Sequence, residues 1–184
     1  MTGKTMCNEI ERVLISEEQI KEQIQRVAAE LDEYYNGREP IAICILKGSV
    51  IFFADLIRAM KTSVSVEFMK VSSYGFGTES SGKLSVSLDI LSNIEGKDVL
   101  IVEDIVDSGN TMYALKNMLQ GRKPASVRIV TLLDKPARRV ADVSPDHTCF
   151  EIEDEFVIGY GLDYAEKYRD LPFVGILKRS VYEK

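Results

Sequence analysis

The segment that decides the fold reads Asp98-Val-Leu-Ile-Val-Glu-Asp-Ile-Val-Asp-Ser-Gly-Asn-Thr111. In it, four apolar residues run directly into the adjacent acids Glu103 and Asp104, and a helix-forming stretch follows from Met112. A continuous apolar run with turn signals after it is typical of a buried parallel strand. Ligands of open α/β sheets bind at the C-terminal ends of such strands. The segment therefore predicts a strand, a binding loop and a helix, in that order.

The loop from Asp107 to Thr111 combines an acid, small hydroxyl residues and a glycine. Its backbone N–H groups and two hydroxyls can point toward one position at a helix N-terminus, which suits a phosphate. The alternative is a plain turn in which Asp and Ser side chains only cap the helix. Two consecutive acids at the end of a buried strand are costly without a ligand, a cation or solvent. Acids that can hold a polyol beside a loop that can hold a phosphate predict a sugar-phosphate site.

This ordered pattern resembles the phosphoribosyl-pyrophosphate (PRPP) motif of the phosphoribosyltransferases. The resemblance implies that Glu103 and Asp104 hold the ribose hydroxyls. It implies that the 5′-phosphate is bound by the loop residues Asp107, Ser108, Gly109, Asn110 and Thr111. It also implies that Asp107 is the catalytic acid–base residue, whereas the alternative role of Asp107 is to shape the loop through side-chain to backbone bonds.

The totals describe an ordinary globular chain and exclude several classes of protein. Of 184 residues, 45% are hydrophobic and 28% charged, with a net charge of -6, which fits one domain with a substantial core. No apolar run is long enough to span a membrane, and no signal peptide is evident. The acidic balance argues against a dedicated nucleic-acid binder. Three scattered cysteines and a single histidine give no zinc-ligand spacing, and a reducing cytoplasm is the expected location.

Apolar runs and helical patterns alternate along the chain. Ser16, with Gln19 three residues later, opens a predicted helix that ends at Asn36 and Gly37. Further helices are predicted at 50–60 and 112–119, and strands at 41–46, 64–72, 84–88, 99–102, 127–133, 156–160 and 173–177. This alternation predicts a mostly parallel sheet with helices on both faces, and the short late strands suggest a small hood.

A second junction between a strand and a helix reads Leu46-Lys-Gly-Ser49. Backbone amides there can hold an anion, and Lys47 adds a cation, although a plain turn is the alternative for so short a motif. Beside the PRPP-like motif it resembles the family's pyrophosphate loop. The resemblance implies that Lys47, Gly48 and Arg169 contact pyrophosphate, and that the peptide bond before Lys47 is cis.

The segment 72–83 is rich in serine and glycine, which by itself indicates a surface connection. It resembles the flexible loop of the hypoxanthine-guanine phosphoribosyltransferases, in which Ser73 and Tyr74 match a Ser-Tyr pair. Closure of such a loop keeps water away from a reactive sugar cation.

Lys135 follows a predicted strand, where a solvated surface charge is the ordinary interpretation. The resemblance implies that Lys135 donates to the oxygen at purine position 6. A donor at this position favours 6-oxopurines over adenine, and sites built on such a bond discriminate by about 10⁴ or more. The two arginines that follow, Arg138 and Arg139, are interpreted as surface charges.

The segment 154–172 is similar to bacterial hypoxanthine-guanine phosphoribosyltransferases almost without interruption. The resemblance implies that Phe156 stacks on the purine, that Val157 offers backbone groups to its edge, and that Asp163 lies at the purine site and binds a Mg²⁺ ion. Glu153 stands where many relatives have proline, which affects only the turn before the segment.

The resemblance covers most of the chain and implies a type I phosphoribosyltransferase-like α/β fold. We expect one domain, 1–184, with a hood built from the N-terminal residues and about 150–184. The implied reaction converts hypoxanthine or guanine and PRPP to nucleotide and pyrophosphate. It requires Mg²⁺ at Glu103, Asp104 and Asp163, in a homodimer or homotetramer that binds neither nucleic acid nor membrane. The alternatives are a xanthine-preferring relative, an RNA-binding regulator on the same fold, and a metabolite-binding domain without turnover.

Overall fold

The computed structural model describes residues 8–73 and 84–183. Its larger sheet has the strand order β4-β3-β2-β5-β6-β7, and all neighbouring strands are parallel except the antiparallel pair of β3 and β4. The strands are β2 (Ile41–Ile45), β3 (Ser65–Ser73), β4 (Leu84–Leu88), β5 (Asp98–Val106), β6 (Ser126–Asp134) and β7 (His147–Glu151). The mostly parallel α/β sheet predicted from the sequence is confirmed.

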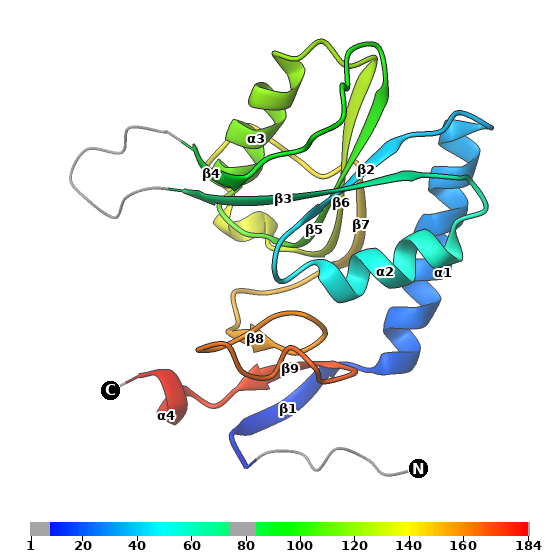
Figure 1. Cartoon of the computed structure of the whole chain (residues 1–184). Helices are drawn as coiled ribbons and strands as arrows, with labels where there is room; N and C mark the ends of the chain where they lie inside the picture. The colour runs from blue at the N-terminus through cyan, green and yellow to red at the C-terminus, as the bar shows by residue number, and fades with distance from the viewer. Residues whose placement is uncertain (1–7, 74–83, 184) are drawn as a thin grey trace.

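Helices cover both faces of this sheet, as Figure 1 shows. The helices α1 (Glu17–Tyr35) and α2 (Val50–Ala59) pack on one face, and α3 (Asn110–Gln120) packs on the other. Alternate side chains of β5 pack on opposite faces of the sheet. Leu100 and Val102 join the core under α1 and α2, whereas Val99 and Ile101 join the core under α3. Burial on both faces explains why this strand reads as one continuous apolar run.

The first helix begins and ends where the sequence predicts. The Ser16 hydroxyl accepts a hydrogen bond from the Gln19 N–H, and the Gln19 side chain accepts one from the Ser16 N–H, which completes the capping box. At the other end, Asn36 adopts the left-handed conformation that commonly terminates helices (φ 44°).

A smaller sheet has the order β1-β9-β8 and lies below the larger one in Figure 1. It joins β1 (Ile10–Ile15) from the N-terminal end to β8 (Val157–Ile158) and β9 (Val174–Leu177). The short turns η1 (Pro136–Arg138) and α4 (Arg179–Tyr182) complete the described elements. That the two sheets act as one domain stays a prediction.

Three details of the fold differ from the sequence-based expectation. β5 continues through both acids to Val106, so Glu103 and Asp104 lie within the strand and not after it. β8 is only two residues long, because Gly159 and Gly161 have φ of +96° and +102° and turn the chain away. The strands β1 and β7 were not predicted.

Candidate functional site

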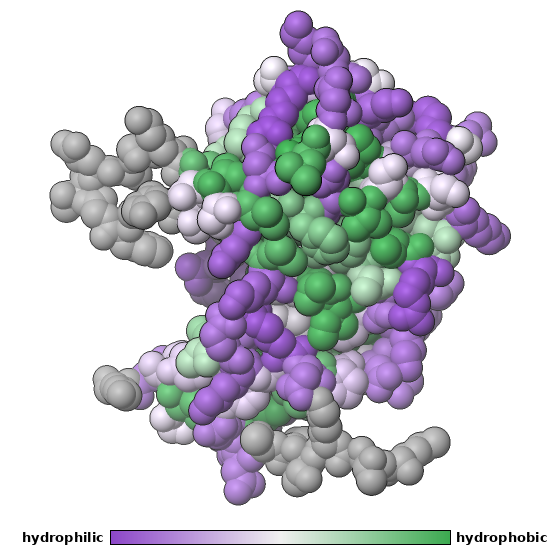
Figure 2. All heavy atoms as spheres, in the orientation of Figure 1, coloured by the Kyte–Doolittle hydropathy of each residue, from purple (hydrophilic) through white to green (hydrophobic). Residues whose placement is uncertain are grey.

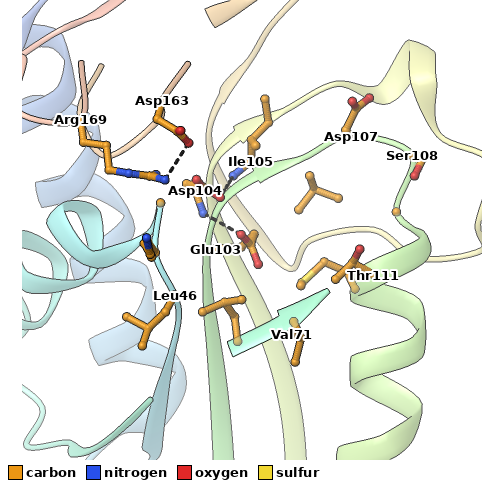
Figure 3. Close-up of a pocket in the computed structure, with 16 residues that line it drawn as sticks. Leu46, Val71, Glu103, Asp104, Ile105, Asp107, Ser108, Thr111, Asp163 and Arg169 are labelled. Atoms are coloured by element: carbon orange, nitrogen blue, oxygen red, sulfur yellow. Dashed lines mark hydrogen bonds and ion pairs between the residues drawn. The ribbon is translucent and has the colours of Figure 1, made fainter. Parts of the chain in front are cut away.

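A pocket of about 320 Å³ opens at the C-terminal ends of β2 and β5. It is lined by residues of three segments that the sequence analysis singled out: Lys47, Gly48, Glu103, Asp104, Asp107, Ser108, Gly109, Thr111, Asp163 and Arg169. In Figure 3, Asp163 and Arg169 approach from the side of the smaller sheet, and Glu103 and Asp104 face them from β5. The fold therefore brings together residues separated by more than a hundred positions.

The two adjacent acids are held in the last part of β5 (Figure 3). Glu103 is 9% exposed. Burial, and then the charge of Asp104, raise the pKa of Glu103 well above its ordinary value. Local backbone donors support the pair: the Asp104 N–H donates to Glu103 Oε1 at 3.3 Å, and the Ile105 N–H donates to Asp104 Oδ1 at 2.9 Å. Hydroxyl donors or a cation from a ligand would relieve the remaining repulsion.

The predicted phosphate loop, residues 107–111, runs from β5 into the first turn of α3. Gly109 is the residue before α3 and has a φ of +82°, a conformation that favours glycine. Ser108, Gly109 and Thr111 line the pocket, next to the first turn of a helix, whose N–H groups lack intrahelical partners. Asn110 is exposed and does not line the pocket; its N–H lies 3.5 Å from Ser108 Oγ.

Arg139, which follows η1, holds this loop in place, so the interpretation of Arg139 as a surface charge is wrong. Its side chain is only 15% exposed and forms an ion pair with Asp134 at the end of β6. It also donates to the carbonyl oxygens of Asp107 (3.1 Å) and Val143 (2.6 Å). A Cβ at Gly109 would lie 2.6 Å from the Arg139 side chain, so the glycine also makes room for the arginine.

The loop after β2, predicted to bind pyrophosphate, has the backbone that the resemblance implies. The Leu46–Lys47 peptide bond is cis, as expected. Gly48 packs so closely that a Cβ on it would lie 1.6 Å from Asp104 Oδ2, and a Cβ on Gly161 would lie 1.9 Å from the Gly48 carbonyl oxygen. The two glycines therefore allow β5, the loop after β2 and the segment after β8 to meet.

The cations of this pocket are paired with carboxylates. Lys47 Nζ lies 3.0 Å from Glu166, and Arg169 Nη2 lies 2.8 Å from Asp163 and 3.5 Å from Glu166. Glu166 is well exposed and was not recognised from the sequence. The buried Nε of Arg169 has no hydrogen-bond partner in the described structure. An anion bound here has both cations and a free donor available to it.

A second pocket, of about 450 Å³, shares Ile105 and Asp107 with the first. It is lined by Lys135, Phe156 and Val157, the residues predicted to bind the purine, and by Arg138, Asp154 and Tyr182, which the sequence analysis did not assign to a site. Asp163 lines only the first pocket. Arg138 is exposed, as its interpretation as a surface charge predicts, but it also forms ion pairs with Asp107 and Asp154 that the sequence did not indicate.

The walls of the second pocket offer one aromatic surface and one buried cation. The Phe156 ring is 38% exposed and stacks on Tyr182 of α4, with the ring centroids 4.7 Å apart. Lys135 is buried, donates to the Glu155 carbonyl oxygen at 2.8 Å and lies 3.5 Å from Asp154. Because an ammonium has three donors, one remains for a ligand. The stacking of Tyr182 on Phe156 could not be predicted from the sequence, because only the fold brings these two residues together.

The structure describes only the first residue of the two assigned to the flexible loop. Ser73 is the last residue of β3, and Tyr74 lies outside the described residues. In the described part of the chain, no helix is long and apolar enough to cross a membrane.

The chain resembles known proteins over nearly its whole length. Residues 14–165 match the family model for the phosphoribosyl transferase domain. The hypoxanthine-guanine phosphoribosyltransferase of Bacillus subtilis is 50% identical over 178 residues, 97% of this chain and 99% of that protein. A hypoxanthine phosphoribosyltransferase structure from Staphylococcus aureus superposes with a TM-score of 0.95 at 46% identity, and the match covers 100% of both chains.

Some relatives are much longer. The bifunctional protein TilS/HprT of Listeria monocytogenes is 46% identical over 182 residues, which is 99% of this chain but 28% of that protein. This chain therefore spans about a quarter of the length of those relatives.

Gly161→Ala tests the close contact between the segment after β8 and the loop after β2. We expect this change to lower the free energy of unfolding by about 2–5 kcal/mol, because the new Cβ overlaps the Gly48 carbonyl and a positive φ is strained in alanine. Urea denaturation measures the change. Gly121→Ala is the control, since Gly121 has a φ of -60° and the nearest atom to its Cβ lies at 3.3 Å. Equal stability of the two variants would contradict this account of the contact.

Proposed function

Because the chain belongs to the phosphoribosyltransferase family, and within it to the hypoxanthine-guanine phosphoribosyltransferases, we propose that it catalyses purine salvage. In the proposed reaction, hypoxanthine or guanine attacks PRPP, and IMP or GMP and pyrophosphate are released. The observation that carries this proposal is the pair of pockets that share Asp107. One pocket has the groups to bind a sugar phosphate, the other has the groups to bind a purine, and both open onto one carboxylate.

PRPP is assigned to the first pocket. Glu103 and Asp104 accept hydrogen bonds from the ribose hydroxyls, and the loop 107–111 binds the 5′-phosphate. Charge-assisted hydrogen bonds contribute about 1.5–3 kcal/mol each, whereas the dipole of α3 adds only about 0.3–1 kcal/mol. Lys47, Gly48 and Arg169 bind the pyrophosphate, which replaces Glu166 as the partner of the two cations.

The chemistry of the pocket fits Mg²⁺. Its carboxylates (Glu103, Asp104 and Asp163) supply the hard oxygen ligands that this ion prefers. No three histidine, cysteine, aspartate or glutamate side chains converge into a metal cluster in residues 8–73 and 84–183. Mg²⁺ commonly takes one or two carboxylates and completes its shell with water and substrate phosphate. A site of this kind does not require three converging protein ligands. When bound, Mg²⁺ neutralises charge on the leaving pyrophosphate.

The base is assigned to the second pocket. Phe156 provides the stacking surface, Val157 provides backbone groups, and Lys135 donates to the oxygen at position 6. Adenine carries an amino group at that position, so it would leave the remaining donor of the buried ammonium without an acceptor, which is costly. Asp163 is assigned to Mg²⁺ and not to the base, because it lies in the first pocket and pairs with Arg169.

Asp107 is assigned as the proton acceptor for the reaction between the two pockets. As N9 of the purine attacks the anomeric carbon, the bond from that carbon to pyrophosphate breaks, and Asp107 accepts the proton from N7. The position of Asp107 on the wall of both pockets supports this role.

The direct test is to mix the protein with PRPP, Mg²⁺ and one of hypoxanthine, guanine, xanthine or adenine, and to measure nucleotide and pyrophosphate. We expect IMP and GMP to form, adenine to be inert, and excess EDTA to abolish turnover. A kcat/KM that is highest for xanthine would favour the xanthine-preferring alternative. Absence of nucleotide with every base would contradict the proposal, and salt-sensitive RNA binding in a gel shift would then favour the regulator.

We further propose a cytoplasmic homodimer or homotetramer. The free, buried thiols of Cys44 and Cys149 suit a reducing compartment. Exposed apolar side chains on α2 and β3 (Val50, Val66 and Phe68) gather on the face shown in Figure 2 and supply a surface for self-association.

Asp107→Asn tests the proton acceptor. We expect kcat to fall by roughly 10²–10⁴, the usual size of a general acid–base contribution, because an amide cannot accept the proton. Steady-state kinetics and circular dichroism measure activity and fold. Asp142→Asn, an exposed aspartate outside both pockets, is the control. Near-normal turnover of the Asp107 variant would leave this residue with a structural role only.

Lys135→Ala tests base recognition. We expect KM for hypoxanthine and guanine to rise by about 10-fold or more, because a charge-assisted hydrogen bond is lost, and KM for PRPP to change little. Lys97→Ala, an exposed lysine before β5, is the control. An equal loss of affinity for PRPP and purine would refute the assignment.

A further inference from the structure

Arg138 connects the proposed proton acceptor to the proposed base-reading lysine. Its Nε lies 2.8 Å from Asp107 Oδ1, and its Nη1 donates to Asp154 Oδ1 at 3.0 Å. The same Asp154 oxygen lies 3.5 Å from Lys135 Nζ. Four side chains of alternating charge therefore run from Asp107 to Lys135, and all four line the second pocket.

The contact with Arg138 is the one that orients Asp107. Asp107 Oδ1 is buried and has no hydrogen bond of good geometry within the described residues, so the Arg138 guanidinium is the cation placed against it. A guanidinium that contacts one carboxylate oxygen restricts the plane of the carboxylate. The second oxygen is then the one that can contact a bound base.

The geometry of a purine explains why the four charged side chains from Asp107 to Lys135 would be linked. N7 and the oxygen at position 6 lie on one edge of the ring, so a proton acceptor for N7 and a donor to that oxygen must keep a fixed separation. Asp107 directly follows β5 and Lys135 directly follows β6, and the charged pair of Arg138 and Asp154 spans the interval between them. Misplacement of a reacting group by about 1 Å can cost roughly 10²-fold in rate.

We propose that Arg138 is a positioning residue, which orients Asp107 toward the base, and that Asp154 ties this orientation to Lys135. The inference rests on the proposed function. Arg138 does not contact the reacting atoms itself. The Arg138 and Asp154 side chains are 48% and 54% exposed, and ion pairs at such exposure contribute little to stability. Their substitution is therefore expected to change catalysis and not folding.

Arg138→Gln and Arg138→Lys test this role. We expect Arg138→Gln to lower kcat about 10-fold with KM for PRPP and the melting temperature unchanged. Arg138→Lys should recover part of the loss, because lysine keeps the charge but not the fork of donors. Arg122→Gln is the matched control, since Arg122 forms a comparable ion pair with Asp89 outside both pockets.

A double-mutant cycle separates positioning from a general structural effect. If Arg138 acts through Asp107, then adding Arg138→Gln to Asp107→Asn causes no further loss of kcat, because the group to be oriented is already gone. Asp154→Asn should lower kcat and also raise KM for the purine, because it loosens both Arg138 and Lys135.

Two results overturn the inference. One is an unchanged kcat in Arg138→Gln, and the other is an equal further loss of kcat when Arg138→Gln is added to Asp107→Asn. A wild-type protein that forms no nucleotide from any base overturns the proposed function instead, so the two failures are distinguishable.

Discussion

Two adjacent carboxylates at the buried end of a central strand are the constraint on which the rest of the site depends. Glu103 and Asp104 follow a run of residues that is buried on both faces of the sheet, and burial, with the charge of Asp104 beside it, raises the pKa of Glu103. Purely apolar surroundings would make the burial of these two carboxylates too costly in free energy. The pocket, the close approach of Gly48 and the cations across it supply the polar surroundings that such a pair requires.

The cations opposite these acids form ion pairs that an incoming anion can replace. Lys47 and Arg169 pair with Glu166, which is 65% exposed. An ion pair of this exposure contributes only about 0–1 kcal/mol, so an incoming anion that binds both cations through several oxygens displaces it at small cost. The pairing also keeps the two long side chains near the pocket, which reduces the conformational entropy lost when an anion binds.

The sequence predicted the elements whose signal is local. The capping box of α1 and the apolar run of β5 each depend on neighbouring residues, and the structure places them as expected, although β5 continues past the two acids to Val106. β1 was missed because its strand conformation depends on pairing with β9, whose residues lie more than 150 positions later. Arg139 was misinterpreted, and the ion pairs of Arg138 were missed, for the same reason, since the carboxylates that bind these arginines come from other strands and loops. A charge pattern alone does not identify partners that only the fold brings close.

The order of the strands explains why the ligand pocket lies between β2 and β5. From β2 the chain crosses through α2 on one face to β3, whereas from β5 it crosses through α3 on the opposite face to β6. The loops after β2 and β5 therefore diverge and leave a crevice at the carboxyl edge of the sheet, as in other open α/β folds. The crevice is bordered by two helix N-termini, which favour anions. β6 lies on the other side of β5, so Lys135, which directly follows β6, falls beside this crevice, and a second pocket that shares Asp107 with the first follows from the topology of the sheet.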